Sequence, residues 1–93
     1  MNENESKFYS IEEIRKFQER GVQVLDSSSV FISRDVEPEN ILPGCIIHPC
    51  SRISGAKTQI HSSAHIGLSG PATIENSWIG ENAIVGNLGP VTL

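Results

Sequence analysis

Aromatic side chains are scarce in this sequence and make up only 5% of its 93 residues. A rounded globule usually fills its core with more of these rings, because each one buries a large apolar area. A narrow interior lined by Ile and Val does not need them. The composition therefore favours a thin core within a single domain, which is the most that a chain of this length forms.

Long apolar runs and an excess of positive charge are also missing. No apolar run approaches the roughly 18 residues of a membrane helix, so we expect no membrane-spanning segment. The formal net charge is −4. Nucleic-acid binding requires clustered Lys and Arg, so we expect no nucleic-acid partner. Residues 1–5 are polar and acidic, unlike a signal peptide. We therefore expect a cytoplasmic protein.

Cysteine is rare as well, and its spacing carries little information. Cys45 and Cys50 lack the CxxC spacing of zinc and redox sites, and no second pair accompanies them. A thiol such as that of Cys45 behaves as a small hydrophobe when it is buried. We expect neither a disulfide nor a metal site at these cysteines.

What the sequence does contain is a ladder of β-branched residues at spacings of five to eight positions, most often six. This spacing is neither the period of a helix nor that of a single flat strand. It is typical of hexapeptide repeats and predicts a parallel β-helix, in which each short strand stacks on the strand one coil earlier. The members of the ladder are Val24, Val30, Val36, Ile41, Ile47, Ile53, Ile60, Ile66, Ile74, Ile79 and Val85.

Small residues two positions before the ladder members support this interpretation. A narrow coil favours them, because a second large side chain would overpack the interior. Arg34 and Glu39 break the rule, so we expect the first turns to be irregular or to point these side chains outward. A sandwich of ordinary short strands is the alternative. From Cys45 onward the small residues are Cys45, Ser51, Thr58, Ala64, Ala72, Ser77 and Ala83.

A helix is expected before the ladder. Ser10 and Glu13 have the spacing of a capping box, and Gly21 suits the position after a helix end, so we predict a helix over 10–20. The chain then divides into a disordered or extended tail at 1–9, a capping helix at 10–21, and about four β-helix coils at 22–93, with roughly 18 residues in each coil. The far end lacks a capping element, so we expect a fragment, or a β-helix truncated at its C-terminal end.

Several segments of the chain carry a resemblance to a known family. They are 21–26 (Gly-Val-Gln-Val-Leu-Asp), 66–67 and 79–80 (both Ile-Gly), and 75–83. Together with the preceding helix they resemble the bifunctional N-acetylglucosamine-1-phosphate uridyltransferase/glucosamine-1-phosphate acetyltransferases, the UDP-N-acetylglucosamine pyrophosphorylase-like proteins. The resemblance implies a mainly β fold, a left-handed parallel β-helix and a homotrimer. The left hand comes from the resemblance alone, since the general rule for parallel crossovers favours the right hand.

The chain also departs from this family. It has no Gly-rich, Arg-containing phosphate loop, and Asp26 precedes Ser27 where the family usually has Pro. The acetyltransferase catalytic residues of the family lie further along the β-helix than this sequence reaches. The resemblance implies a transferase parent that uses Mg²⁺ with a sugar nucleotide, or acetyl-coenzyme A. For this chain alone we expect no cofactor and no complete active site.

Five residues are candidates for chemistry. The family's acyltransferases use a His as general base at a cleft between subunits, and a neutral imidazole suits that role. Solvated or corner-capping imidazoles are the alternative. Two cations could contact a phosphate of a sugar nucleotide or of coenzyme A, or else lie on a solvated surface. The candidates are His48, His61 and His65 for catalysis, and Arg52 and Lys57 for phosphate binding.

Three functional hypotheses remain open at this stage. The first is a structural and oligomerisation module of a nucleotidyltransferase or acyltransferase, in which Trp78 is a trimer contact. The second is a hexapeptide acyltransferase that uses a coenzyme A thioester and a His at a subunit interface. The third is a carbonic-anhydrase-like β-helix in which histidines bind Zn²⁺ across a subunit boundary.

Overall fold

The part of the chain that the structure describes is mainly β, with one α-helix followed by a series of very short strands. The structure is a computed structural model that describes residues 7–68, 72–86 and 90–92. The expectations for 1–6 and for most of the far end, 87–93, therefore lie outside the described residues. The elements are α1 (Ile11–Glu19), β1 (Gln23–Val24), β2 (Phe31–Ile32), the 3-10 turn η2 (Pro38–Asn40), β3 (Ile46–Ile47), β4 (Arg52–Ser54), β5 (Gln59–Ile60), β6 (His65–Ile66), β7 (Thr73–Glu75), β8 (Trp78–Ile79), β9 (Ile84–Val85) and β10 (Pro90–Thr92).

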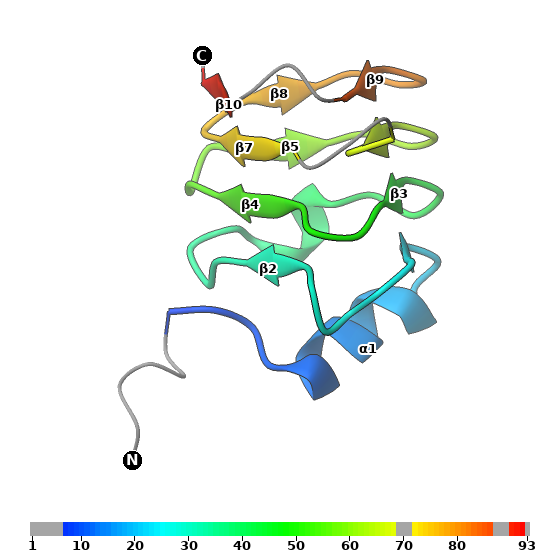
Figure 1. Cartoon of the computed structure of the whole chain (residues 1–93), viewed down its shortest axis with the longest axis vertical. Coiled ribbons are helices and arrows are strands. Elements are labelled where there is room, and N and C mark those ends of the chain that lie inside the picture. The colour runs from blue at the N-terminus through cyan, green and yellow to red at the C-terminus, as the bar shows by residue number, and fades with distance from the viewer. Residues whose placement is uncertain (1–6, 69–71, 87–89, 93) are drawn as a thin grey trace.

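The strands form parallel sheets that the chain visits in turn. One sheet has the order β1-β3-β6-β9, the second has the order β10-β7-β4-β2, and the third pairs β5 with β8. An isolated parallel bridge joins Ile41 to Ile60 and extends the third sheet by one layer. Figure 1 shows the result as a vertical stack of layers with α1 beneath the first one. Each strand therefore pairs with strands from the neighbouring coils rather than with its neighbours in sequence.

The centre of the core is formed by three columns of aliphatic side chains, one behind each sheet. In every column the members are partners in the strand register or in the isolated bridge, so they lie directly above one another. All of the residues below are buried. The columns are Val24, Ile47 and Ile66; Ile32, Ile53 and Ile74; and Ile41, Ile60 and Ile79.

The predicted ladder is confirmed in most of these positions and is wrong in the first coil. Val30 is buried, but Ile32 is the residue in register with Ile53. Val30 instead occupies the position two before the ladder member. Val36 is also buried, but it lies in a bend outside the strands, where its N–H donates to the carbonyl of Ser33. The first coil contains more residues than the later coils, so a ladder with a fixed spacing of six residues loses register there.

The small residues two positions before the ladder members are buried as predicted, with Ala83 only partly so. Their hydroxyls stay satisfied by short-range bonds, since an unpaired buried hydroxyl is costly. Ser51 Oγ donates to the carbonyl of His48 at 2.9 Å, and Thr58 Oγ1 donates to that of Ser54 at 2.6 Å. Both cysteines are free, and burial raises the pKa of the Cys45 thiol to about 11. Arg34 and Glu39 are exposed.

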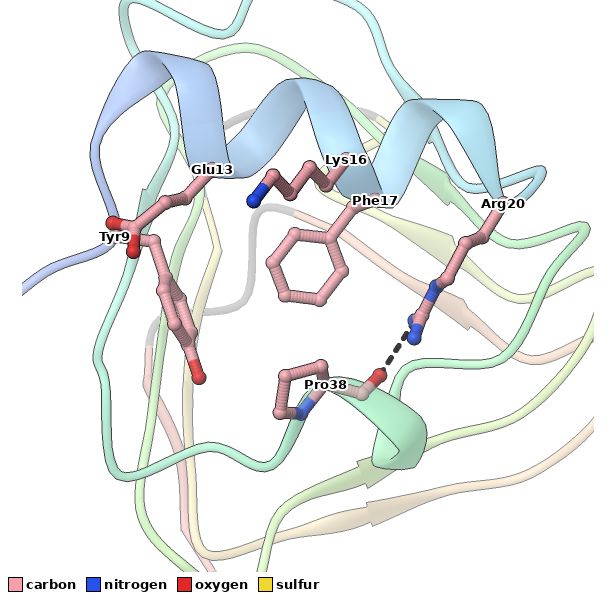
Figure 2. Close-up of a pocket in the computed structure, with 6 residues that line it drawn as sticks. All are labelled: Tyr9, Glu13, Lys16, Phe17, Arg20 and Pro38. Carbon is pink, nitrogen blue, oxygen red and sulfur yellow. Dashed lines mark hydrogen bonds between the residues drawn. The ribbon is translucent and has the colours of Figure 1, made fainter.

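Helix α1 covers the first coil with its apolar face. Ile14 and Phe17 are buried beneath it. The ring of Tyr9 meets that of Phe17 edge to face, with centroids 5.4 Å apart, and Figure 2 shows both rings between the helix and Pro38. Gly21 follows the helix end with a φ of +103°, a conformation that glycine adopts without strain.

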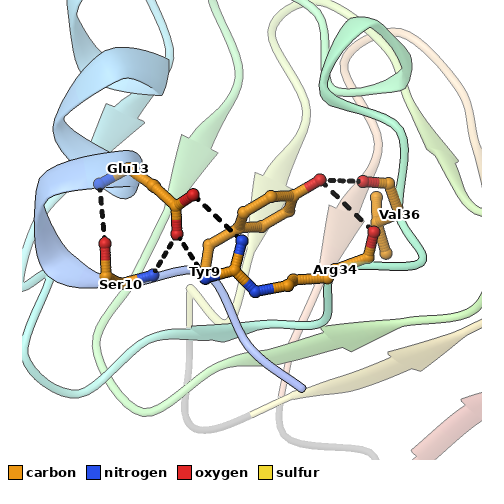
Figure 3. Close-up of polar contacts among 5 residues, drawn as sticks. All are labelled: Tyr9, Ser10, Glu13, Arg34 and Val36. Atoms are coloured by element: carbon orange, nitrogen blue, oxygen red, sulfur yellow. Dashed lines mark hydrogen bonds and ion pairs between the residues drawn. The ribbon is translucent and has the colours of Figure 1, made fainter. Parts of the chain in front are cut away.

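The predicted capping box is present at the start of α1. The N–H of Glu13 donates to Ser10 Oγ, and the N–H of Ser10 donates to Glu13 Oε1. The same carboxylate pairs with the Arg34 guanidinium at 2.8 Å, while Tyr9 donates from its hydroxyl to the carbonyl of Val36 at 2.7 Å (Figure 3). These contacts tie the helix start to the first coil.

Residues 7–9 cover the outer edge of β2. Phe8 forms an antiparallel bridge with Ser33, and the N–H of Tyr9 donates to the carbonyl of Ile32 at 2.9 Å. The backbone groups of this edge strand are therefore paired, which protects it from joining another chain.

In the part of the chain that the structure describes, no helix has both the length and the apolar character to cross a membrane.

Candidate functional site

Side chains that could bind a ligand or react lie at the outward positions of the sheets, because the inward positions are filled by the aliphatic columns. Side chains alternate along a strand, so the residue beside each buried Ile or Val faces away from the core. Register places these outward residues above one another. They are Gln23, Ile46, His65 and Ile84 on the first sheet, Phe31, Arg52 and Thr73 on the second, and Gln59 and Trp78 on the third.

Two of the three candidate histidines meet at the first sheet. His65 lies in β6 opposite Ile46, and His48 follows β3 directly. Their rings are stacked with an interplanar angle of 27°, and His48 Nε2 lies 3.4 Å from His65 Nδ1. Both side chains are half-buried. Burial lowers the pKa of His48, and the neighbouring charge of His65 lowers it further.

This pair supplies a neutral imidazole at neutral pH, since a lowered pKa keeps His48 unprotonated. Such an imidazole can accept a proton from an amine or a hydroxyl. Both residues are candidates predicted from the sequence, but their pairing is not predicted. The signal was the ladder itself: Ile47 and Ile66 are stacked partners, so the residues beside them are neighbours across the coil.

His61 lies at a different sheet and packs against a different residue. It follows β5, and its ring lies 4.7 Å from that of Trp78 between centroids. Trp78 faces outward as expected and is 57% exposed. The three histidines therefore do not form one cluster. Within residues 7–68, 72–86 and 90–92, no group of three or more metal-ligating side chains comes together.

Arg52 lines a hollow on the second sheet. Its guanidinium lies over the ring of Phe31 at 5.1 Å, and Phe8 meets Phe31 edge to face at 5.7 Å. The hollow has a volume of about 400 Å³. It combines cationic groups with aromatic surface, which suits an anionic ligand that also has an apolar part. The residues lining it are Lys7, Phe8, Phe31, Ser33, Arg34, Asp35, Arg52, Ile53, Ser54 and Thr73.

Lys57 is exposed in the turn after β4 and does not line this hollow. Its backbone N–H donates to Asn76 Oδ1 at 3.2 Å. Arg52 and Lys57 therefore do not form one phosphate site. The two aromatic rings of the hollow are those of Phe8 and Phe31, and neither is among the candidates predicted from the sequence. Phe8 lies in the segment predicted as a tail, and Phe31 lies beside Ile32, where the predicted ladder is out of register.

A second hollow lies between α1 and η2 and has a volume of about 300 Å³. Figure 2 shows Arg20 reaching down from the helix end, where its Nη2 donates to the carbonyl of Pro38 at 2.7 Å. The Arg20 guanidinium also lies 5.4 Å from the ring of Phe17. The lining is mostly apolar, and these contacts hold the helix on the first coil. The residues around it are Tyr9, Glu13, Lys16, Phe17, Arg20 and Pro38.

Comparison of the chain with protein-family models, with curated proteins and with solved structures finds no match. The chemical content of the outward surfaces is therefore the basis for a functional assignment.

Proposed function

We propose that this chain is a structural and oligomerisation module, the hexapeptide-repeat portion, a left-handed parallel β-helix, of a sugar-nucleotide pyrophosphorylase-like or acyltransferase-like protein. One observation carries the proposal. Large apolar side chains project from outward positions while the core is already complete, with Ile84 62% exposed, Trp78 57% and Leu25 54%. Burying these side chains against other copies of the chain would remove their apolar surface from water, which favours association.

The candidate catalytic groups support a module rather than a complete enzyme. The two paired histidines lie at the first sheet, whereas Arg52 lies on the second and His61 on the third. A phosphate held at Arg52 would thus be on a different face from the paired imidazoles. We expect the isolated chain to show no uridyl transfer from UTP with Mg²⁺ and no acetyl transfer from acetyl-coenzyme A. Turnover in either assay would contradict the module.

The proposed assembly is a homotrimer. In a cyclic trimer each copy presents one face to one neighbour and a different face to the other, and the closed ring leaves no such surface unpaired. Aromatic residues are enriched among those that dominate association energy, which makes Trp78 the leading contact. The resemblance to trimeric transferases supports both the trimer and the left hand.

Sedimentation velocity at tens of micromolar tests the trimer. We expect the unaltered chain to sediment as a trimer, and Trp78→Ser to weaken association by about tenfold or more. Glu12→Ser is the control, because it alters an exposed residue of α1 away from the sheets. A monomer at this concentration, or equal weakening by both substitutions, would refute the proposal. Thermal unfolding of each variant shows whether it is folded.

A second function is favoured by the paired imidazoles. If a neighbouring subunit completes the cleft, His48 would remove the proton from an amine that attacks the thioester carbon of an acyl-coenzyme A, and the thiolate would leave. Acetyl transfer that is lost in His48→Ala and retained in His61→Ala would establish this alternative. Equal activity in the two variants would exclude His48 as the base.

A further inference from the structure

We propose that His48 and His65 form a binding site for a divalent late transition-metal ion such as Zn²⁺, Ni²⁺ or Cu²⁺, held within one chain. The observation behind this proposal is the approach of His48 Nε2 to His65 Nδ1 at 3.4 Å. The site is independent of the trimer, since both ligands come from the same copy. Its test requires no substrate, so metal binding is measured separately from acyl transfer by His48.

The spacing of the two nitrogens suits two ligands of one ion. Zinc binds imidazole nitrogens at about 2.0–2.1 Å with tetrahedral angles, which places two such nitrogens roughly 3.3–3.4 Å apart. The observed separation of 3.4 Å matches this spacing, and it is also that of a long hydrogen bond between the two rings. Metal titration distinguishes the two arrangements.

The backbone fixes both ligands before any ion arrives. The N–H of His48 donates to the carbonyl of Ile66 at 2.8 Å, and the N–H of His65 donates to that of Ala83 at 2.8 Å. Each histidine is thus anchored by a bond to the next coil, and the two coils are in parallel register at Ile46 and His65. Preorganised ligands lose little freedom when they bind.

The chemistry of the site selects the class of ion. Neutral imidazole is a borderline ligand that suits Zn²⁺, Ni²⁺ and Cu²⁺ and discriminates against Mg²⁺ and Ca²⁺, which prefer oxygen. The lowered pKa of His48 helps, since a metal ligand has to be unprotonated. Metal binding requires the tautomers that leave His48 Nε2 and His65 Nδ1 free of protons. Water molecules complete the coordination shell.

The third histidine provides a matched control. His61 also follows a short strand and is also half-buried, but its ring packs against Trp78. His61→Ala therefore removes an imidazole without touching the proposed ligands. Cys50 is an exposed free thiol and would bind the same ions. All proteins are therefore compared in a Cys50→Ser background, without a histidine tag.

Isothermal titration with ZnCl₂, NiCl₂ and CuCl₂ in a non-coordinating buffer tests the site on the full chain. We expect one ion per chain, with Cu²⁺ bound most tightly, as the usual order of divalent affinities requires. His48→Ala and His65→Ala should each weaken binding by about tenfold or more, since two-point attachment is lost. His61→Ala should bind like the parent. The Cu²⁺ complex should show hyperfine coupling to two nitrogens in electron paramagnetic resonance.

Several outcomes would overturn the assignment. Binding that survives in both single variants, or that falls equally in His61→Ala, would show that the ions attach to scattered surface groups. No binding by the folded parent would show that the rings are held by packing alone. His48→Gln is included with the alanine variants, and circular dichroism checks that each remains folded. Zn²⁺ should raise the unfolding temperature of the parent and of His61→Ala only.

Discussion

Gly55 is the position at which a single added methyl group should matter most. Its φ is +99°, and a Cβ built there would clash with the Asn76 side chain and lie 2.6 Å from the Asn76 backbone nitrogen. Asn76 is held in place because its N–H donates to the carbonyl of Ser54. The corner of one coil is thus closed by the residue at the same corner of the next.

We predict that Gly55→Ala destabilises the fold by about 2–4 kcal/mol, the sum of a backbone term and an overpacking term. Gly44→Ala is the matched control. Gly44 also has a positive φ, +94°, but its Cβ would meet the nearest atoms at 3.6 and 3.8 Å, which is ordinary contact. It should lose only about 1 kcal/mol. Urea denaturation measures both, and equal losses would show that the Asn76 corner gives way freely.

Residue-level patterns also explain what the sequence could reveal about the site. Each histidine could be selected as a candidate from the sequence. The outward orientation of Trp78 could also be predicted, because Trp78 lies beside a buried ladder residue. The pairing of His48 with His65 was not predicted, because it depends on which coil each ladder member belongs to. The hollow at Arg52 was missed for a related reason, since Phe31 comes into register only when Ile32 replaces Val30 in the ladder.

The capping box of α1 was predictable because it is a local signal, complete within four residues. Its coupling to the rest of the molecule was not predictable, because Arg34 comes from the first coil. The Arg34 guanidinium and the bond from the Ser10 N–H hold the pKa of Glu13 down to about 2, from 4.5. The helix start is therefore both a cap and an anchor.

A lowered carboxyl pKa makes stability depend on pH in a defined direction. Glu13 binds its proton more readily in the unfolded chain, so its contribution is fully present above pH 4.5 and is lost as the pH falls toward about 2. We predict that Glu13→Gln removes this part of the acid sensitivity and lowers stability at neutral pH by about 1 kcal/mol. Glu12→Gln, in the same first turn, should leave this acid sensitivity unchanged. Urea midpoints between pH 2 and 7 test this, and parallel curves for the two variants would contradict it.

At the scale of the whole molecule, the parallel architecture was predictable because every regular coil repeats the same pattern of one large and one small buried residue. The ladder register of the first coil was predicted wrongly, because the residues around Val36 and η2 make this coil longer. That coil is also the one held by non-repeating parts of the chain, namely α1 on its open end and residues 7–9 on the edge of β2. Its stability therefore depends on contacts that the repeat does not supply.

A stack of coils in which each layer contacts mainly its neighbours should respond locally when an end is loosened. Phe17 is buried between α1 and the first coil, so Phe17→Ala should cost about 3–5 kcal/mol. Hydrogen exchange should then accelerate in β1 and β2 well before it does in β8. Ile60→Ala, in the middle of the third column, is the comparison and should instead speed exchange in β5 and β8. If Phe17→Ala accelerates every strand equally, the coils unfold as one cooperative unit, and the helix stabilises the whole stack rather than only its first layer.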